Sequence, residues 1–229
     1  MIISNLDIPF LLLSMIFNSS LEYAVYFDDF RLKEGRRGNG IVVTEERSIE
    51  DFDSIEVHGA IQLELTCQAE PSLSIKAEEN LLPIIETNCR DGLLVIRSTE
   101  AYKSTKPIIV KTSCSKLVRY QGVGATEGKV DNVESESLQV ELSGACSLVI
   151  QKGKVNSLKA SVSGASSMNA GNVEASNAIV TTSGASKAIV KVSEELTAKA
   201  DGVSGVVNKA HAKVVKKRIS SMAYVQQAK

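Results

Sequence analysis

The chain has 229 residues, of which 43% are hydrophobic and only 4% aromatic, with no tryptophan. This length allows one or two domains with a sizeable core, and the hydrophobic content excludes a disordered protein. The net charge of −1 hides an asymmetry: residues 1–115 hold 18 acidic and 11 basic side chains, whereas residues 116–229 hold 9 and 15. The basic half could favour anionic partners, and a solvated β surface explains it as well.

The N-terminal segment has one property of an export signal. Residues 8–17 form an apolar stretch with the length of a signal-peptide core, which is too short to span a membrane as a helix. No Lys or Arg precedes this stretch, and neither an Ala-x-Ala cleavage site nor a lipoprotein Cys accompanies it. A cluster of breakers from Gly35 to Gly40 follows. We therefore expect residues 1–37 to be a leader and linker without a transmembrane span.

Residues 38–115 alternate apolar and polar side chains, which is the period of a β-strand. Four runs carry the pattern: 55–57, 61–65, 73–77 and the more apolar 93–96. Turn signals separate them at Gly59, 70–72 and 91–92. Between two of the runs, residues 79–86 could form one helical turn or a loop that leads into a strand. This region is predicted to be a strand-rich N-terminal portion of four to six strands.

Residues 116–229 repeat a Ser-Gly-Ala-Ser motif. Its glycines recur at intervals of 20 residues and finally 18: Gly124, Gly144, Gly164, Gly184 and Gly202. Runs of period two, such as 138–142 and 158–162, lead into the copies. A 20-residue period with two or three short strands predicts a parallel β-helix, a solenoid of about 20-residue coils that ends in a C-terminal cap. The predicted fold class is therefore all-β.

The repeated glycines are predicted to form the corners of the coils. Glycine accepts a positive φ and allows neighbouring backbones to approach closely. The small Ala and Ser side chains can stack on their counterparts one coil away. The alternative is that the Ser and Gly residues form a ligand-binding ladder on one face.

The cysteines and histidines show no metal-ligand spacing. Cys67, Cys89, Cys114 and Cys146 are expected to be small buried apolar residues, and in an exported protein a Cys67–Cys89 disulfide is possible. His58 and His211 are expected to be surface or turn residues. Hence no metal site is predicted.

No motif for a cofactor or for catalysis is present either. The glycines of Gly122-x-Gly124-x-x-x-Gly128 have the wrong spacing for a dinucleotide-binding loop. A carbohydrate-active enzyme would need clustered carboxylates, and Glu134, Glu136 and Glu141 are expected on a solvated strand face. The sequence therefore predicts a non-enzymatic protein without a cofactor.

A basic cluster lies near the C-terminus: Lys213, Lys216, Lys217 and Arg218. It could contact an anionic polysaccharide or lipid head groups. Nucleic acid is not expected, because no aromatic residues interleave with the basic ones. A charged cap that protects the open edge of the last coil is the alternative.

Several segments together resemble a known family. The segments GNGIVVTEER (38–47), FDSIEVHGA (52–60) and AEENLLP (77–83), with the Ser-Gly-Ala-Ser series, are similar to the autotransporter adhesin head domain, or GIN domain, frequent in Bacteroidetes. The resemblance covers roughly residues 38–223. It implies an exported protein, periplasmic or at the cell surface, for which the family offers no established reaction or ligand.

These observations lead to three functional hypotheses. The first is a non-catalytic, adhesin-like envelope protein that binds a glycan or a protein through a β-helix face. The second is a structural envelope protein that assembles into homo-oligomers. The third, a carbohydrate-active enzyme, is the least supported by the sparse carboxylates.

Overall fold

The computed structural model describes residues 35–220 and 222–227. The predicted export signal lies outside these residues. Residues 35–37, at the end of the predicted linker, are described: β1 (Arg36–Arg37) pairs in parallel with β8 (Tyr102–Lys103). A single 3₁₀ helix, η1 (Glu79–Ile84), occurs among the described residues.

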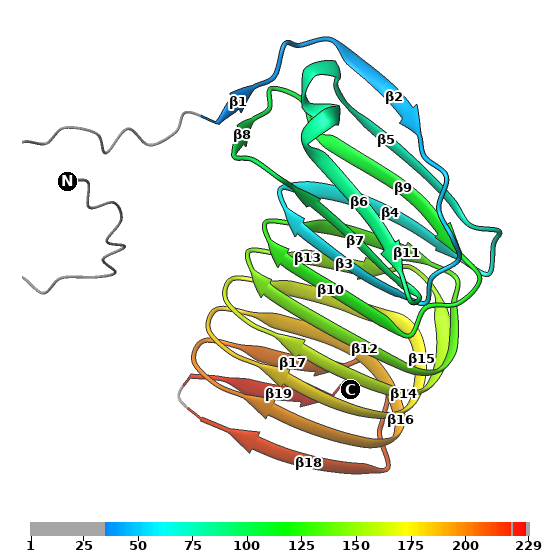
Figure 1. The fold of residues 1–229 in the computed structure, drawn as a ribbon. Helices are drawn as coiled ribbons and strands as arrows, with labels where there is room; N and C mark the ends of the chain where they lie inside the picture. Colours follow the sequence, from blue (N-terminus) through cyan, green and yellow to red (C-terminus); the bar gives the residue numbers. More distant parts are fainter. Residues whose placement is uncertain (1–34, 221, 228–229) are drawn as a thin grey trace, which may run out of the picture. The chain divides into compact units, whose positions relative to one another are not determined.

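The other strands form one 17-stranded sheet (Figure 1). Its N-terminal members are β2 (Val42–Glu46), β3 (Ser54–Gly59), β4 (Ile61–Cys67), β5 (Ser72–Glu78), β6 (Ile85–Arg90), β7 (Leu93–Ser98) and β9 (Ile108–Cys114). The rest are β10 (Arg119–Gly124), β11 (Glu127–Asp131), β12 (Val133–Gly144), β13 (Ser147–Ile150), β14 (Gly153–Val162), β15 (Ser167–Thr182), β16 (Lys187–Ala200), β17 (Gly205–Asn208), β18 (Val214–Ile219) and β19 (Tyr224–Gln227). The all-β prediction is confirmed.

The predicted parallel β-helix is wrong, because the sheet is mixed. Three strand pairs run antiparallel: β2–β5, β5–β9 and β6–β7. The β6–β7 pair turns at Asp91 and Gly92, whose φ angles are +50° and +76°, as in a tight hairpin that reverses the chain. Alternation of apolar and polar residues assigns side chains to faces but leaves the direction of the neighbouring strand open. The sequence pattern therefore predicted the strands and missed these reversals.

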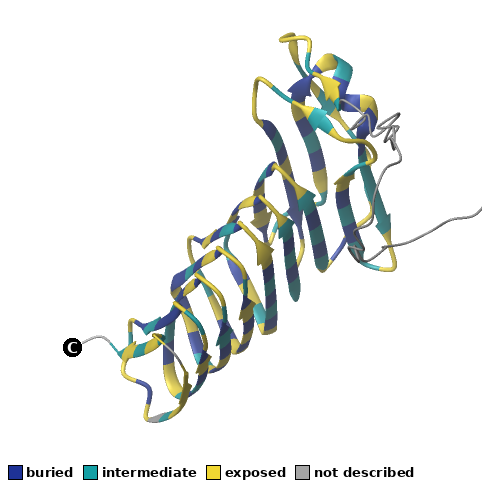
Figure 2. Ribbon diagram, turned by 90° about the vertical axis from the view of Figure 1, so that its left-hand side faces the viewer, coloured by how far each residue is buried: buried dark blue, intermediate teal, exposed yellow. Residues whose placement is uncertain are grey.

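Within the C-terminal part, successive strands pair in parallel and in register. Tyr120 lies opposite Val140, which lies opposite Ala160 and then Val180. Each step is 20 residues, so every inward side chain stacks on its equivalent in the next strand. Figure 2 shows the resulting alternation of buried and exposed residues along the strands. The core is therefore a set of continuous rows of Val, Leu, Ile and Ala.

The repeated glycines lie where one strand of the stack ends and the chain turns. Gly144 has a φ of +106°, and a Cβ atom there would lie 2.4 Å from the carbonyl oxygen of Gly124. The next residue, Ala145, donates its N–H to that same oxygen at 2.6 Å. Equivalent bonds join Ala165 to Gly144 and Ala185 to Gly164. The turns thus stack backbone on backbone, which leaves no room for a side chain.

The other two glycines of the Gly122-x-Gly124-x-x-x-Gly128 motif make room for Tyr120. The ring of Tyr120 is fully buried, although the positions opposite it hold smaller side chains. A Cβ on Gly128 would lie 2.3 Å from the Tyr120 hydroxyl oxygen. A Cβ on Gly122 would lie 2.7 Å from Thr126 Oγ1 and 3.5 Å from the ring. The motif that resembled a nucleotide loop is therefore a packing device.

Glu78, at the end of β5, is a fully buried carboxylate that joins three segments. It accepts hydrogen bonds from Ser104 Oγ (2.6 Å), from both the N–H and Oγ1 of Thr105 (2.9 Å each), and from the N–H of Gly40 (2.7 Å). These bonds, with that of Ser104 first, lower the pKa of Glu78 to about 2. The carboxylate is therefore ionised wherever the fold is stable.

Replacing Glu78 with Gln is expected to lower the urea midpoint of unfolding, because an amide cannot accept all four bonds. A depressed pKa contributes stability that is present above the ordinary carboxyl pKa and is lost as the pH falls toward 2. The gap between the wild-type and variant midpoints should hence be full at pH 7 and shrink below about pH 4.5. Glu79→Gln, at the exposed neighbour, is the control; a gap that does not change between pH 7 and pH 3 would refute the role of Glu78.

Candidate functional site

One outer surface of the sheet carries polar side chains in two regular rows, which we call the row face. The first row follows the register Ser54, Arg119, Gln139, Lys159, Ile179, Thr197 and Lys216. The second follows Glu56, Gln121, Glu141, Ser161, Thr181, Lys199 and Arg218. Neighbouring strands lie about 4.8 Å apart. Equivalent positions therefore repeat at this spacing across seven strands, from β3 to β18.

The centre of the row face contains a connected polar cluster. Arg119 donates from Nη2 to Gln121 Oε1 at 2.6 Å, and the same nitrogen lies 3.6 Å from Glu141 Oε2. Gln139 donates to the other oxygen of Glu141. These contacts hold four polar side chains of β10 and β12 in fixed positions, so this part of the surface is preorganised.

Beside this cluster the surface is hollowed. A groove of 420 Å³ is lined by Gln121, Glu141, Leu142, Ser143, Lys159, Ser161 and Ser163. A neighbouring groove of 170 Å³ shares Glu141, Lys159 and Ser161 and continues to Ile179 and Thr181. Lys159 thus stands between two adjoining grooves whose walls offer amide, carboxylate and hydroxyl groups.

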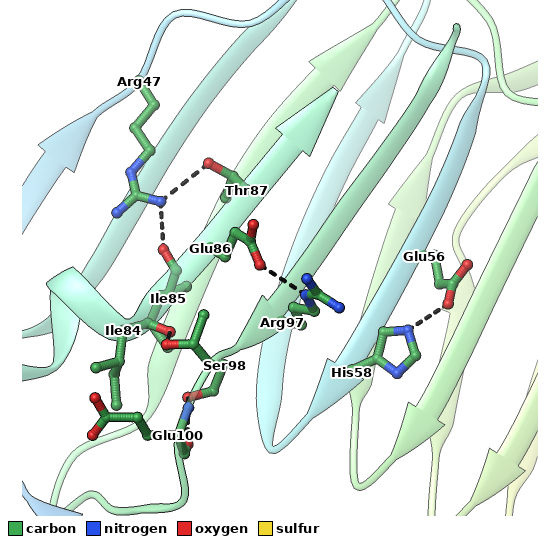
Figure 3. A network of polar contacts seen from close by, with 11 residues as sticks. Arg47, Glu56, His58, Ile84, Ile85, Glu86, Thr87, Arg97, Ser98 and Glu100 are labelled. Atoms are coloured by element: carbon green, nitrogen blue, oxygen red, sulfur yellow. Dashed lines mark hydrogen bonds and ion pairs between the residues drawn. The ribbon is translucent and has the colours of Figure 1, made fainter. Parts of the chain in front are cut away.

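The surface continues onto β7 and β6, which follow β3 in the sheet. Figure 3 shows two ion-paired carboxylates in this region: Glu86 with Arg97, at 2.8 Å, and Glu56 with His58. A groove of 230 Å³ lies over the β6–β7 hairpin and is lined by Glu86, Asn88, Arg90, Leu93, Val95 and Arg97. The edge of β6 is bound by Arg47, which donates to the carbonyl oxygen of Ile85 at 2.6 Å and to Thr87 Oγ1 at 3.0 Å.

The charges of this surface are unequally satisfied. Each of its carboxylates on β6, β3, β12 and β16 contacts a cation or a donor: Glu86, Glu56, Glu141 and Glu195. In contrast, four cations make no side-chain hydrogen bond or ion pair with any described residue: Arg90, Lys159, Lys199 and Arg218. Lys199 and Arg218 are direct neighbours in register. Like charges opposite each other are unfavourable in a sheet, so this pair suits an anion between them.

The structure separates the four cations of the predicted basic cluster. Lys213 and Lys216 form ion pairs with Glu194 and Glu195, at 2.8 Å and 2.7 Å. Lys217 lies opposite the buried Ala198, at the end of the core row through Tyr120, and donates to the carbonyl oxygen of Val225. Arg218 belongs to the row face beside Lys199.

The acidic residues weighed for catalysis are not gathered into a site. Glu136 accepts a hydrogen bond from Asn156, Glu141 contacts Arg119, and Glu134 lies opposite Lys154 in register. Among the described residues, no group of three or more His, Cys, Asp and Glu side chains could hold a metal ion. The part of the chain that the structure describes also contains no helix of the length and apolar character needed to cross a membrane.

The four cysteines are free thiols. Cys67, Cys114 and Cys146 are buried, whereas Cys89 is partly exposed. Cys67 lies in register with Cys114 rather than beside Cys89, so the disulfide considered from the sequence is not formed.

The fold and surface define a class of all-β protein with a repetitive polar face. This chain belongs to the family described as "Putative auto-transporter adhesin, head GIN domain", whose model matches residues 51–212. The resemblance seen in the sequence is thereby confirmed. A comparison with functionally curated proteins finds no match.

Solved structures support the fold. A putative adhesin from Bacteroides fragilis NCTC 9343 is similar over 85% of this chain and 100% of its own, with 14% identity and a TM-score of 0.68. A putative adhesin from Parabacteroides merdae ATCC 43184 matches 84% of this chain and 98% of its own, with 18% identity and a TM-score of 0.57. At these identities the similarity concerns the fold.

Sequence reasoning missed most of the row face. Its residues are 20 apart in the chain, so the strand register alone brings them together. One signal was available: in the repeats, position Gly minus 3 holds Gln121, Glu141, Ser161, Thr181 and Lys199. Aligning the copies by their glycines would have revealed a polar column there.

Proposed function

We propose that this chain is a non-catalytic, adhesin-like protein of the cell envelope and that it binds an anionic glycan across the row face. Membership of a family described as adhesin fits an exported or surface protein and favours binding over catalysis. The single observation that carries the choice of ligand is the charge balance: the carboxylates of the face are engaged, whereas four cations are not.

The spacing of the cations suits a linear ligand. Lys199 and Arg218 lie on adjacent strands, and Lys159 lies two strands before Lys199. Because strands repeat about every 4.8 Å, these cations are distributed along the direction in which the strands stack. A polymer with a carboxylate or sulfate on successive sugars could contact several of them at once, and such multivalent contact strengthens weak individual bonds.

The composition of the face favours a glycan over a protein partner. Protein interfaces usually have an apolar core that is rich in aromatic residues. The two rows contain a single apolar side chain, Ile179, which is 51% exposed, and no aromatic one. Amide, hydroxyl and charged groups predominate instead, and they match the hydroxyl and acid groups of a uronate or sulfated sugar.

The alternative, a self-assembling envelope protein, is less well supported at the C-terminal end of the stack. Core rows there end in polar side chains: Lys217 follows Ala198, and Asn208 follows Val190. Asn208 is fully buried and bonds to both the N–H and the carbonyl oxygen of Val192, at 2.8 and 3.0 Å. A polar end of this kind is typical of a cap, which opposes end-to-end stacking of copies.

The proposal is tested by isothermal titration of the full chain with an oligogalacturonate and with the same oligomer after reduction of its carboxylates. We expect binding to the anionic form only, with an affinity that decreases as salt is added, since exposed charges are screened. Equal binding to the two forms would contradict the proposed ligand class. A lack of binding to the oligouronate and to sulfated dextran would contradict it as well.

A further inference from the structure

We propose that Cys67 and Cys114 are the site of a disulfide bond that forms when the chain folds in an oxidising compartment. The two residues end β4 and β9, which pair in parallel, and they lie directly opposite each other in the register. Adjacent strands place paired Cα atoms about 4.8 Å apart, within the 4.4–6.8 Å that disulfides span. The pair therefore needs no backbone displacement to be joined.

The surroundings favour bond formation between these two sulfurs. Both side chains are buried, at 1% and 0% exposure, and the strand ends there, so the Cβ atoms have some freedom to approach. The Cys114 thiolate accepts a hydrogen bond from the Cys67 thiol, which lowers the pKa of Cys114 and raises that of Cys67. Cys114 is consequently the more nucleophilic sulfur of the pair.

The reaction is a thiol–disulfide exchange with a disulfide oxidant, such as glutathione disulfide or a protein disulfide catalyst. The Cys114 thiolate attacks one sulfur of the oxidant, forms a mixed disulfide and releases the first thiol of the oxidant. The Cys67 thiolate then attacks the Cys114 sulfur and releases the second. The two cysteines lose two protons and two electrons, and the oxidant is reduced to two thiols. Because both residues are buried in the final fold, the exchange precedes closure of this end of the sheet.

The bond would close a loop that contains the strands that make the sheet mixed. Residues 68–113 include β5, η1, β6, β7 and β8, which complete the N-terminal end of the sheet. A cross-link stabilises chiefly by restricting the unfolded chain, and more so for a long loop. We expect the oxidised protein to unfold at a temperature roughly 10 °C above that of the reduced protein.

The test is to refold the full chain in a glutathione redox buffer, block free thiols with iodoacetamide and map the peptides without reduction. We expect a mass 2 Da below that of the reduced chain before alkylation and a cross-linked peptide that joins Cys67 to Cys114, with Cys89 and Cys146 alkylated. Alkylation of all four cysteines, or a Cys67–Cys89 peptide, would overturn the proposal.

Two single variants separate the bond from effects on folding. Cys89→Ser should keep the cross-link and the higher melting temperature. Cys67→Ser should remove both the cross-link and the dependence of the melting temperature on a reductant. A cross-link that persists in Cys67→Ser would contradict the assignment, and the peptide map of the unmodified chain decides the matter even if that variant folds poorly.

Discussion

Replacing Gly144 with alanine is expected to destabilise the protein by roughly 3–5 kcal/mol, the largest effect of any single substitution considered. The new Cβ would lie 2.4 Å from the carbonyl oxygen of Gly124, and the φ of +106° is unfavourable for any residue with a side chain. That oxygen also accepts the N–H of Ala145 at 2.6 Å. Relieving the clash would hence break the bond that joins one turn to the next. Urea unfolding followed by circular dichroism measures the loss.

Gly40→Ala is the matched control for Gly144→Ala. Gly40 has a φ of +80°, yet no atom lies within 4 Å of the position that its Cβ would occupy. It should cost only the backbone strain of a left-handed residue, about 1–2 kcal/mol. Similar losses in the two variants would show that backbone conformation alone requires glycine in these turns and that close stacking does not matter.

The second large effect is expected at Gly128, where alanine should cost about 1–3 kcal/mol by overpacking the core. A Cβ atom there would lie 2.3 Å from the Tyr120 hydroxyl oxygen and 2.8 Å from Leu148 Cδ1. The hydroxyl itself has no hydrogen-bond partner of acceptable geometry among the described residues. Tyr120→Phe alone should therefore leave the stability within about 0.5 kcal/mol of the wild type or raise it.

The double variant tests whether the hydroxyl is the obstacle. Removing the hydroxyl with Tyr120→Phe should recover about 1 kcal/mol or more of the loss caused by Gly128→Ala, which is a measurable coupling between two contacting residues. Additive losses in the double variant would mean that Gly128 is required for another reason, such as its contact with Leu148.

Much of the strand content could be predicted from the sequence, because alternation and turn residues are local properties. Asp91-Gly92 marked a turn, and a tight β6–β7 hairpin lies there. The repeated glycines marked positions where the backbone has positive φ. Strand direction is different: β5 pairs antiparallel with β9, more than 30 residues away in the chain, and no local pattern encodes that pairing. The parallel β-helix expectation failed for this reason.

The surface chemistry was harder to predict than the strands. Four consecutive basic positions near the C-terminus suggested one patch, but the register distributes them among two ion pairs, a core row and the row face. The partner of Arg218 on that face is Lys199, 19 residues earlier in the chain. Such juxtapositions depend on which strands pair and on which face each residue lies, so they follow from the fold rather than from proximity in sequence.

The measurement that tests the proposed function most directly compares two double variants in their affinity for the oligogalacturonate. Lys199→Ser with Arg218→Ser removes two cations from the row face; Lys129→Ser with Lys187→Ser removes two from the outer surface of β11 and β16. Loss of two charge-assisted contacts should weaken binding by at least about 10-fold in the first variant, while the second changes it less than about 2-fold. Equal affinities for the two variants would contradict binding at the row face.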